Sequence, residues 1–331
     1  MRILATGGAG YVGSAVCRQL LKRGYEAFAY DNLGKGFRQA LPDGCLIEGD
    51  LDDYSLLSKV LRERRIDVVM HFAASIAVGE SVEQPRLYYR NNIANSLNLL
   101  EAMLDADVKR ILFSSTAAVY APIAEGSLVE DDLIAPASPY AVTKYTIEQM
   151  IRDFSHAYGL NYRILRYFNA CGGSGDGQYG EAHEPETHLI PLVLQVPLGQ
   201  REFIGVFGDD YNTPDGTCVR DYIHVDDLAD AHIRAVESLD TNETGKAKAG
   251  SIYNIGTGTG NSVLEVIRAT EEVVGGKIPI KMLTRRAGDT DRLVAGAERL
   301  RKELGWKPKY DNLRDIIATA WQWHKSHPKG Y

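Results

Sequence analysis

The chain has 331 residues and 44% hydrophobic content, which is enough for a substantial core. Its formal net charge is −7 and its Lys and Arg residues are scattered, so nucleic acid is excluded as a main partner, because that binding requires a basic face. No apolar run approaches the roughly 20 residues that cross a bilayer, so we expect no membrane-spanning helix.

Short apolar runs alternate with longer amphipathic stretches through the first half of the chain, a pattern typical of βαβ units. We therefore expect an α/β fold built on a doubly wound parallel sheet of the Rossmann type. In chain order, the predicted strands are Arg2–Thr6, Tyr25–Asp31, Cys45–Gly49, Asp67–Ala73, Arg110–Thr116 and Asn161–Phe168. The predicted helices between them are Gly10–Arg23, Tyr54–Arg64, Pro85–Asp107 and Ser138–Tyr158.

The pattern changes beyond residue 170. Gly172–Glu186 is rich in glycine and acidic residues and lacks periodicity, which predicts a loop. The rest of the chain mixes short strands and helices, so we expect a smaller, mixed α/β domain there. The predicted division is a first domain of residues 1–170, joined by 220–238, and a second domain formed mainly by 171–331.

The start of the chain and its cysteines indicate a cytoplasmic location. Glycine interrupts the N-terminal apolar stretch early, whereas a signal peptide needs about 7–15 apolar residues. The four cysteines form no CxxC pair and are too few for a disulfide framework, so we expect them to be reduced and structural. They are Cys17, Cys45, Cys171 and Cys218.

A glycine-rich turn, GGAGYVG, lies between the first predicted strand and the first predicted helix. Such glycines allow a tight bend, let the backbone approach a pyrophosphate, and let the helix pack closely on the strand. The helix N-terminus then directs free N–H groups and its positive dipole end at the phosphates. The sequence therefore predicts a dinucleotide site that includes Gly7, Gly10, Tyr11, Val12 and Gly13.

Asp31 ends the second predicted strand, where a carboxylate accepts hydrogen bonds from the adenosine ribose hydroxyls. A 2′-phosphate would be repelled there, so the sequence favours NAD over NADP. Lys35 and Arg38 lie nearby in the sequence and could serve such a phosphate, which keeps NADP as an alternative. The other interpretation of Asp31 is a surface carboxylate in a turn.

Tyr140 and Lys144 have the YxxxK spacing that places a phenol and an ammonium one helical turn apart. Lowering a tyrosine pKa from about 10 to near neutrality requires roughly 4 kcal/mol, whereas an exposed helical ion pair supplies only about 0.3–0.5 kcal/mol. The pair can therefore act only in a dry site beside another positive charge, such as an oxidised nicotinamide ring. Thr116, at the end of a preceding strand, would hold or relay the proton. The alternative is an exposed helix face.

These features, with the run Arg166–Asn169, resemble the extended short-chain dehydrogenase/reductases. Other runs resemble the UDP-glucose 4-epimerases nearly end to end: Val78–Val82, Tyr88–Asn92, Cys218–Val225, Arg285–Asp289, Trp321–His324 and His327–Gly330. The resemblance implies that Thr116, Tyr140 and Lys144 are catalytic. Tyr140 would take the proton of a sugar 4-hydroxyl while hydride passes from C4 to bound NAD. Hydride would then return to the opposite face of a transient 4-keto sugar. A homodimer is also implied, although the two long helices could equally bury their apolar faces within one chain.

The resemblance also implies which residues hold each ligand, with NAD in the first domain and the UDP-sugar mainly in the second. The implied cofactor residues are Gly7, Gly10, Tyr11, Val12, Gly13, Asp31, Asn32, Asp50, Leu51, Phe72, Ala73, Ala74, Asn91, Tyr140, Lys144, Tyr167 and Phe168. The implied substrate residues are Thr116, Tyr140, Asn169, His188, Leu189, Val206, Phe207, Arg220, Arg286, Asp289 and Leu293. The two arginines suit a diphosphate because guanidinium groups bind phosphate oxygens in pairs.

Three positions depart from the pattern of these relatives. Thr116 stands where many have serine, and it keeps the hydroxyl. Ile76 stands where some have a lysine near the cofactor, so that contact is absent. Leu293 stands where some have a tyrosine that narrows the pocket and others have a small residue. Acceptance of N-acetylated sugars therefore stays open, and the leucine disfavours it.

Two weaker patterns have simpler interpretations. Gly256–Gly260 resembles a second nucleotide turn, but a loop leading to a helix after Ser262 is favoured. The acidic and histidine-containing group could suggest a metal site, but without a strict ligand spacing we expect a solvated loop and no metal. Its members are Glu181, His183, Glu184, Glu186 and His188.

Rival functions differ in the residues they need. A nucleotide-sugar 4,6-dehydratase needs an acid and a base after the catalytic threonine, where this chain has Ala117 and Ala118. A ketone reductase would release NAD at each turnover. A UDP-pentose (xylose/arabinose) or UDP-uronate 4-epimerase stays open. A non-catalytic NAD-binding regulator is the alternative of a different class, and it would be expected to lack the tyrosine or the lysine.

Overall fold

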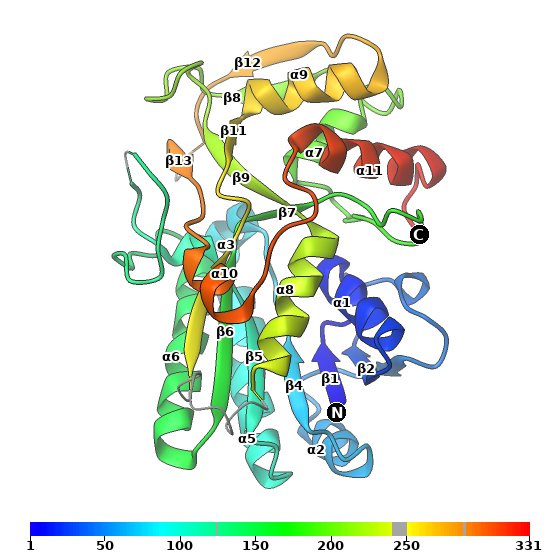
Figure 1. The fold of residues 1–331 in the computed structure, drawn as a ribbon, viewed down its shortest axis with the longest axis vertical. Helices are drawn as coiled ribbons and strands as arrows, with labels where there is room; N and C mark the ends of the chain where they lie inside the picture. Colours follow the sequence, from blue (N-terminus) through cyan, green and yellow to red (C-terminus); the bar gives the residue numbers. More distant parts are fainter. Residues whose placement is uncertain (124, 240–249, 287–288) are drawn as a thin grey trace.

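A computed structural model describes residues 1–123, 125–239, 250–286 and 289–331. Its centre is a seven-stranded parallel sheet in the order β3-β2-β1-β4-β5-β6-β10 (Figure 1). The order reverses between β1 and β4, and open sheets of this kind bind ligands outside the carboxyl ends at that point. The doubly wound sheet is thus confirmed. Its strands are β1 (Arg2–Thr6), β2 (Glu26–Asp31), β3 (Leu46–Glu48), β4 (Val68–His71), β5 (Arg110–Thr116), β6 (Asn161–Tyr167) and β10 (Ser251–Ile255).

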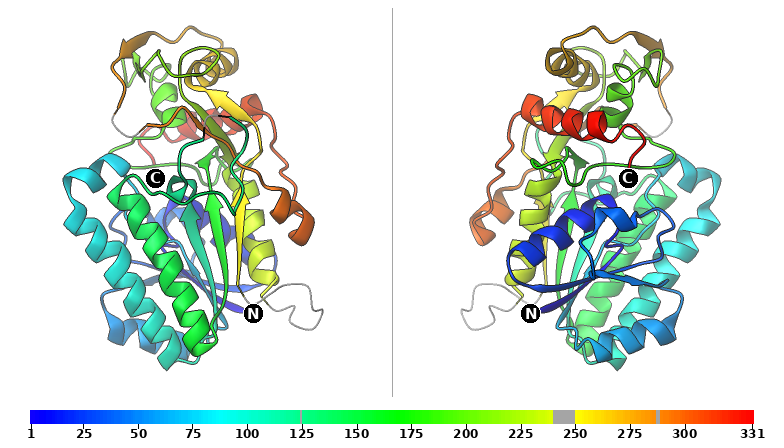
Figure 2. Two further views of the ribbon diagram at one scale, coloured as in Figure 1. Left: turned by 90° about the vertical axis from the view of Figure 1, so that its left-hand side faces the viewer. Right: turned by 90° about the vertical axis from the view of Figure 1, so that its right-hand side faces the viewer.

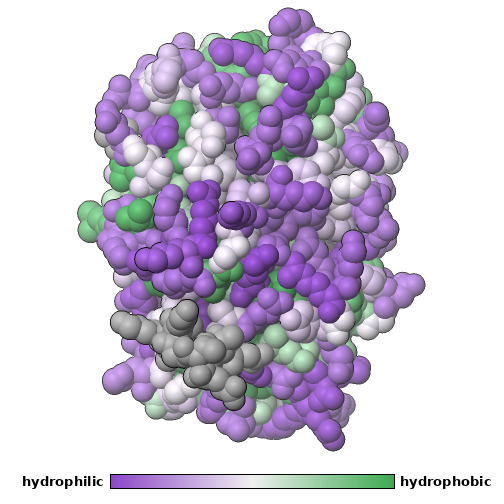
Figure 3. Space-filling model, viewed as in Figure 1, coloured by the Kyte–Doolittle hydropathy of each residue, from purple (hydrophilic) through white to green (hydrophobic). Residues whose placement is uncertain are grey.

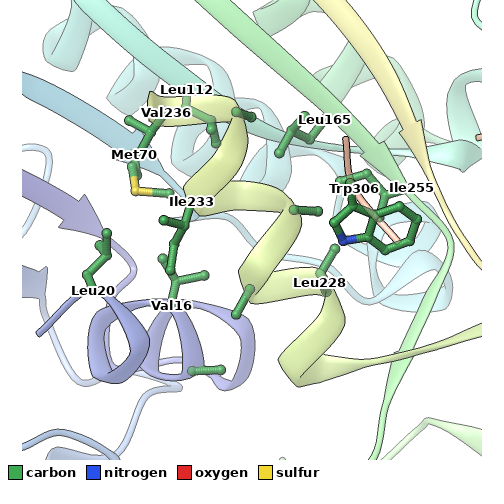
Figure 4. Close-up of a cluster of buried hydrophobic side chains, with 14 of the residues drawn as sticks. Val16, Leu20, Met70, Leu112, Leu165, Leu228, Ile233, Val236, Ile255 and Trp306 are labelled. Atoms are coloured by element: carbon green, nitrogen blue, oxygen red, sulfur yellow. The ribbon is translucent and has the colours of Figure 1, made fainter. Parts of the chain in front are cut away.

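Helices cover both faces of the sheet (Figure 2). One face carries α2 (Tyr54–Glu63), α5 (Asn95–Asp105) and α6 (Pro139–Tyr158), and the other carries α1 (Tyr11–Lys22) and α8 (Val225–Glu237). Successive strand residues point to opposite faces, so buried strands are apolar at consecutive positions. Figure 4 shows the hydrophobic core on the face covered by α1 and α8, where side chains of these two helices contact Met70 and Leu112 of the sheet.

The helix α6 begins where its sequence predicts. Ser138 caps it, with its Oγ accepting the N–H of Ala141 at 3.2 Å, and Pro139 occupies the first turn. Gly159, with a φ of 74°, ends the helix in the left-handed conformation. Tyr140 and Lys144 therefore lie in its first two turns, next to the carboxyl end of β5.

The predicted helix Pro85–Asp107 is wrong as a single α-helix. The structure divides it into α4 (Pro85–Tyr88), a π-helical segment Tyr89–Ala94, and α5. A π turn adds a residue to the helical repeat and shifts the side chains that follow it around the axis. A further short helix, α3 (Val78–Glu83), precedes it and was not predicted.

A smaller region lies over the carboxyl edge of the large sheet (Figure 1). Its four-stranded sheet contains β11, β9 and β13, with β7 paired to β9, and β12 pairs with β8. A capping box of Ser262 and Glu265 begins α9, so the predicted loop at Gly256–Gly260 is confirmed. The strands are β7 (Asn169–Cys171), β8 (Ile204–Phe207), β9 (Val219–His224), β11 (Gly260–Ser262), β12 (Ile280–Leu283) and β13 (Arg292–Leu293). The helices are α7 (Leu189–Leu194), α9 (Val263–Val274), α10 (Glu298–Leu304) and α11 (Leu313–Ser326), and 3₁₀ turns occupy Arg38–Ala40 and Ala117–Val119.

The surface and the cysteines are ordinary for a folded domain. The face seen in Figure 3 is mostly hydrophilic, with separate small apolar areas. The helices of the described residues include none that is long and apolar enough to span a bilayer. Cys17, Cys45, Cys171 and Cys218 are all buried and unpaired.

Candidate active site

The glycine-rich turn joins β1 to α1 so tightly that a side chain at Gly7 or Gly13 would clash with neighbouring backbone atoms. Gly7 has a φ of 70°, and a Cβ there would lie 2.5 Å from the backbone N of Ala73. A Cβ on Gly13 would lie 2.3 Å from the carbonyl oxygen of Gly7. At Gly10, a Cβ would meet only that oxygen, at 3.3 Å, so the turn is open to a ligand on this side.

The N-terminus of α1 presents free backbone N–H groups. Among the described residues, no side chain caps it at Gly10, and its first turn holds no acidic residue. By contrast, Asp53 caps α2 and Ser138 caps α6. Free N–H groups at the positive end of a helix dipole suit an anion, so this turn fits the pyrophosphate of a dinucleotide.

Asp31 is 8% exposed at the carboxyl end of β2. Its two oxygens accept the N–H groups of Ala9 at 2.9 Å and Leu33 at 2.8 Å, which fixes the carboxylate beside the glycine-rich turn. Burial raises the pKa of Asp31, and these two hydrogen bonds oppose the effect. Lys35 and Arg38 are bonded to other groups, Lys35 to a carbonyl and Arg38 to a carboxylate. These contacts favour NAD over NADP.

The other residues implied for the cofactor lie along the same edge of the sheet or next to it. The N–H groups of Phe72 and Ala73 both donate to the Thr6 carbonyl, at 2.9 and 3.0 Å, and hold the loop after β4 against β1. Asn32 donates to Asp50 at 2.6 Å where β2 and β3 end. The remaining members are Tyr11 and Val12 in α1, Leu51 after β3, Ala74 after β4, Asn91 in the π-helical segment, and Tyr167 and Phe168 at the end of β6.

Thr116, Tyr140 and Lys144 meet at the carboxyl end of β5. Lys144 is 1% exposed, and its Nζ donates to the carbonyl of Ser114 at 2.8 Å. Burial lowers the pKa of Lys144 to about 7, and the charge of Glu148 opposes that shift. Burial also raises the pKa of Tyr140, and its hydrogen bond with the Thr116 hydroxyl opposes it. The site is therefore dry, as the sequence argument required.

Asn92, which the sequence marked only as part of the family run Tyr88–Asn92, holds α6 in position. It is fully buried, and its Nδ2 donates to the Ser75 carbonyl and to the Thr143 hydroxyl, both at 3.0 Å. Its Oδ1 accepts the N–H of Ser75 at 2.8 Å. Asn92 thus ties the loop after β4 to the residue before Lys144. Its neighbour Asn91, the residue predicted to position the cofactor, donates to the Ser75 hydroxyl at 3.0 Å.

A buried ion pair lies next to Lys144 on α6. Arg166 and Glu148, with side chains 1% and 0% exposed, are joined by contacts of 2.6 Å (Nη2 to Oε2) and 3.0 Å (Nε to Oε1). Ser115 donates to Glu148 at 2.6 Å, and Arg166 donates to the Tyr120 hydroxyl at 3.0 Å. The pair joins β6 to α6, one turn beyond Lys144. In the sequence, Arg166 is distinguished only as part of the family run Arg166–Asn169.

Two arginines gather around one carboxylate in the smaller region. Arg286 Nε lies 3.0 Å from Asp289 Oδ2, and Arg220 Nη2 lies 3.8 Å from Asp289 Oδ1. The Arg286 guanidinium also lies 4.8 Å from the centre of the Phe207 ring. Asp289 orients the Arg286 guanidinium, whereas Arg220 Nη1 donates to the carbonyls of Val219 and Thr290, both at 2.9 Å. Both guanidinium groups retain donors for a diphosphate. Positions 287–288, part of a family run, lie outside the described residues.

Val206, one of the residues implied for the substrate, could contact a ligand only through its backbone. Its side chain is 0% exposed and packs in a core with Val193 and Ile204, so it can offer a ligand no side-chain contact. Strand residues alternate between faces, and Phe207, the next residue of β8, is the one that is 38% exposed. The others remain available: Asn169 opens β7, His188 and Leu189 begin α7, and Leu293 packs beside Phe168.

The loop before α7 is not the solvated acidic segment that we expected. Glu181 is 3% exposed, and Glu181, His183, Glu186 and His188 place one ligand atom each within 4.8 Å of one another. Burial disfavours a charged His188, but the carboxylates of Glu181 and Glu186 outweigh it and raise the pKa of His188 to about 10. The separations in sequence did not reveal this, because the loop has no regular repeat.

Residues 3–256 match the model of the NAD dependent epimerase/dehydratase family. The chain belongs to this family. It is 49% identical over 331 residues to a UDP-glucose 4-epimerase of Halalkalibacterium halodurans, covering 100% of this chain and 98% of the relative.

Solved structures of similar proteins agree with this membership. A UDP-glucose 4-epimerase from Brucella ovis in complex with NAD has a TM-score of 0.92 and 42% identity, over 97% of each chain. One from Bifidobacterium longum in complex with NAD+ and UDP has a TM-score of 0.93 and 37% identity, over 100% of both chains. As in the NAD dependent epimerase/dehydratase family generally, NAD is the cofactor, and the uncapped turn and buried Asp31 fit it.

Gly13→Ala is expected to weaken NAD binding by about tenfold or more, because overpacking costs roughly 1–3 kcal/mol. The added methyl group would lie 2.3 Å from the Gly7 carbonyl oxygen, so the turn must open. NAD released from the denatured protein, counted per chain, measures the effect. Gly276→Ala is the control, since its Cβ meets nothing within 4 Å among the described residues. Equal NAD content in both variants would contradict the assignment of this turn.

Proposed function

We propose that this protein interconverts UDP-glucose and UDP-galactose by inversion at C4, with NAD as a cofactor that stays bound. The observation that carries the proposal is the buried pair of Tyr140 and Lys144 beside Thr116. It lies at the carboxyl edge of the sheet that bears the nucleotide turn. The similarity of the whole chain to named UDP-glucose 4-epimerases supports it.

The chain's own residues would move the proton. When bound, NAD supplies a hydride acceptor and donor for C4 of the sugar. Tyr140 takes the proton of the 4-hydroxyl and later returns it, and the Thr116 hydroxyl, bonded to Tyr140, relays it. Lys144, held by the Ser114 carbonyl one turn along α6, favours the phenolate by its charge. In a dry site this attraction is much stronger than at a surface.

Besides proton and hydride transfer, inversion at C4 requires that the sugar present each of its two faces in turn to the same hydride donor. The diphosphate must then stay anchored while the sugar ring turns over. Arg220 and Arg286, which both lie near Asp289, suit this anchoring role because their remaining N–H groups can bind phosphate oxygens. An anchor at a distance from C4 leaves the ring free to rotate.

The proposal includes a homodimer in the cytoplasm. Several exposed apolar side chains lie on α3 to α6, where a second copy would cover them, and the buried, unpaired cysteines suit a reducing compartment. The exposed side chains are Val78, Val82, Leu87, Leu97 and Tyr158.

Incubation of the purified protein with UDP-galactose, without added cofactor, tests the proposed function. Chromatography is expected to show UDP-glucose accumulating to equilibrium, because NAD is carried by the protein. No conversion, even after NAD is added, would overturn the glucose/galactose assignment. UDP-xylose, UDP-arabinose and UDP-uronates would then be assayed in the same way.

Leu293→Ala is expected to raise kcat/KM for UDP-N-acetylglucosamine relative to UDP-glucose by about 10-fold or more, the usual effect of pocket volume. Leu293 is half-buried and packs beside Phe168, so its truncation enlarges the pocket. Leu133→Ala, at a side chain 74% exposed, is the control and should leave the ratio unchanged. An unchanged ratio in Leu293→Ala would show that another residue limits the sugar.

A further inference from the structure

A cluster of two histidines and two glutamates lies in the loop before α7. His183 Nδ1 lies 3.5 Å from Glu181 Oε1 and 3.5 Å from Glu186 Oε2. His188 Nδ1 lies 2.8 Å from Glu181 Oε1 and 3.2 Å from Glu186 Oε1. Each histidine therefore directs the same ring nitrogen at both carboxylates, and the four residues enclose one small volume.

The hydrogen bonds of the cluster leave two buried atoms without partners. Within the described chain, neither Glu181 Oε1 nor His183 Nδ1 makes a hydrogen bond, although Glu181 is only 3% exposed. His188 Nδ1 donates to Glu186, and a single N–H cannot serve both carboxylates. An unsatisfied buried carboxylate oxygen is costly, and although His188 Nδ1 lies 2.8 Å from Glu181 Oε1, a cation between the four residues would satisfy both carboxylates at once.

The spacing of the four residues suits a metal ion. Ligands at about 2.0–2.1 Å from zinc in a tetrahedron lie roughly 3.3–3.4 Å from one another. The four histidine–carboxylate distances, 2.8 to 3.5 Å, lie around that value. A proton lies close to one donor and cannot bridge four atoms, whereas a cation at the centre contacts all of them.

We propose that Glu181, His183, Glu186 and His188 bind a divalent transition-metal cation, and that this cation is zinc. Imidazole nitrogens and carboxylate oxygens are both ordinary zinc ligands, and four of them complete a closed, structural site. The two carboxylates would neutralise the charge of the ion. His188 would ligate through Nδ1, the ring nitrogen that faces both carboxylates.

The position of the cluster gives the ion a structural role. The indole N–H of Trp323, in α11, donates to the Glu181 carbonyl at 3.2 Å, and the ring of Tyr11 lies 6.3 Å from that of His183. His324 also lies in α11. Burial lowers its pKa, and the charges of Glu181 and Glu186 oppose that shift. Its Nε2 is buried without a hydrogen-bond partner in the described chain. The ion would therefore hold this loop between α11 and the nucleotide turn.

Metal analysis of the full-length protein tests the site without reference to activity. Protein purified without a histidine tag or chelator is expected to contain one zinc per chain by mass spectrometry. After removal of metal with a chelator, zinc should bind in calorimetry and raise Tm. Glu181→Gln and His183→Gln should weaken zinc binding by about 100-fold or more, since even outer-shell partners contribute 10–100-fold.

Three further variants distinguish the loss of a zinc ligand from a general disturbance of the fold. His183→Cys keeps a zinc ligand and should retain the metal that His183→Gln loses. Glu184→Gln, an exposed position in the same loop, and His156→Gln, exposed on α6, should bind zinc as the unmodified chain does. Absence of metal together with no Tm response to added zinc would overturn the proposal, as would equal binding in His183→Gln and Glu184→Gln. Either outcome leaves the epimerase assignment untouched.

Discussion

Replacing Tyr140 with phenylalanine is expected to lower kcat by about 10²–10⁴-fold, the usual contribution of a positioned acid or base. The phenol is 8% exposed and bonded to the Thr116 hydroxyl, so no water can easily replace it. The ring itself remains, and packing should be preserved. Conversion of UDP-galactose to UDP-glucose under saturating substrate measures the loss.

Two measurements distinguish a loss of the chemical step from a loss of folded structure in Tyr140→Phe. The KM for the UDP-sugar and the NAD content per chain should stay within about twofold of the unmodified protein, because the change removes a transition-state role. Tyr158→Phe, on the same helix but 53% exposed, should keep full activity. A Tyr140→Phe protein that retained its kcat would eliminate Tyr140 as the base.

Arg166→Met is expected to lower the free energy of unfolding by about 3–5 kcal/mol, because it leaves the carboxylate of Glu148 buried and unpaired. Both side chains are at most 1% exposed, so water cannot compensate. Denaturant unfolding of the NAD-loaded protein measures the change. Activity should fall as well, because an unpaired buried carboxylate tends to take up a proton. Glu148, one turn beyond Lys144 on α6, would then lose the charge that opposes the lowering of the Lys144 pKa.

An exposed ion pair supplies the control for this prediction. Lys277 and Glu271 are 2.7 Å apart, but the lysine side chain is 90% exposed, so Lys277→Met should cost less than about 1 kcal/mol. The double variant Arg166→Met/Glu148→Gln should recover part of the loss, since it removes the unpaired charge. Equal costs for the buried and exposed substitutions would contradict the role assigned to Arg166.

The sequence alone predicted the features that depend on residues close together in the chain. Strands β1 and β5 have the predicted bounds, and Ser138 and Gly159 mark the ends of α6 as cap chemistry requires. The glycine-rich turn and the one-turn spacing of Tyr140 and Lys144 are also local patterns. Backbone conformation and side-chain direction within one element follow from a few neighbouring residues, so such patterns are readable without a structure.

Tertiary structure decided what distant segments do to one another. The strand β10 joins the large sheet although it lies beyond residue 170. Glu148 on α6 forms an ion pair with Arg166 on β6. Asn92, in the π-helical segment, contacts Thr143 on α6, and strand alternation directs the Val206 side chain into the core.

The loop of Glu181 to His188 illustrates the physical reason. Its composition suggested solvated charges. In the structure, Glu181 is buried where the loop packs against α11, and one ligand atom from each of the two glutamates and two histidines comes close to the others. Burial and convergence depend on which surfaces meet, and no short-range pattern in this chain encodes that. The sequence by itself determined the type of fold, the glycine-rich turn and the one-turn spacing of Tyr140 and Lys144, because these follow from local patterns. The burial of these two residues, and the partners that hold them in place, exist only once the chain is folded.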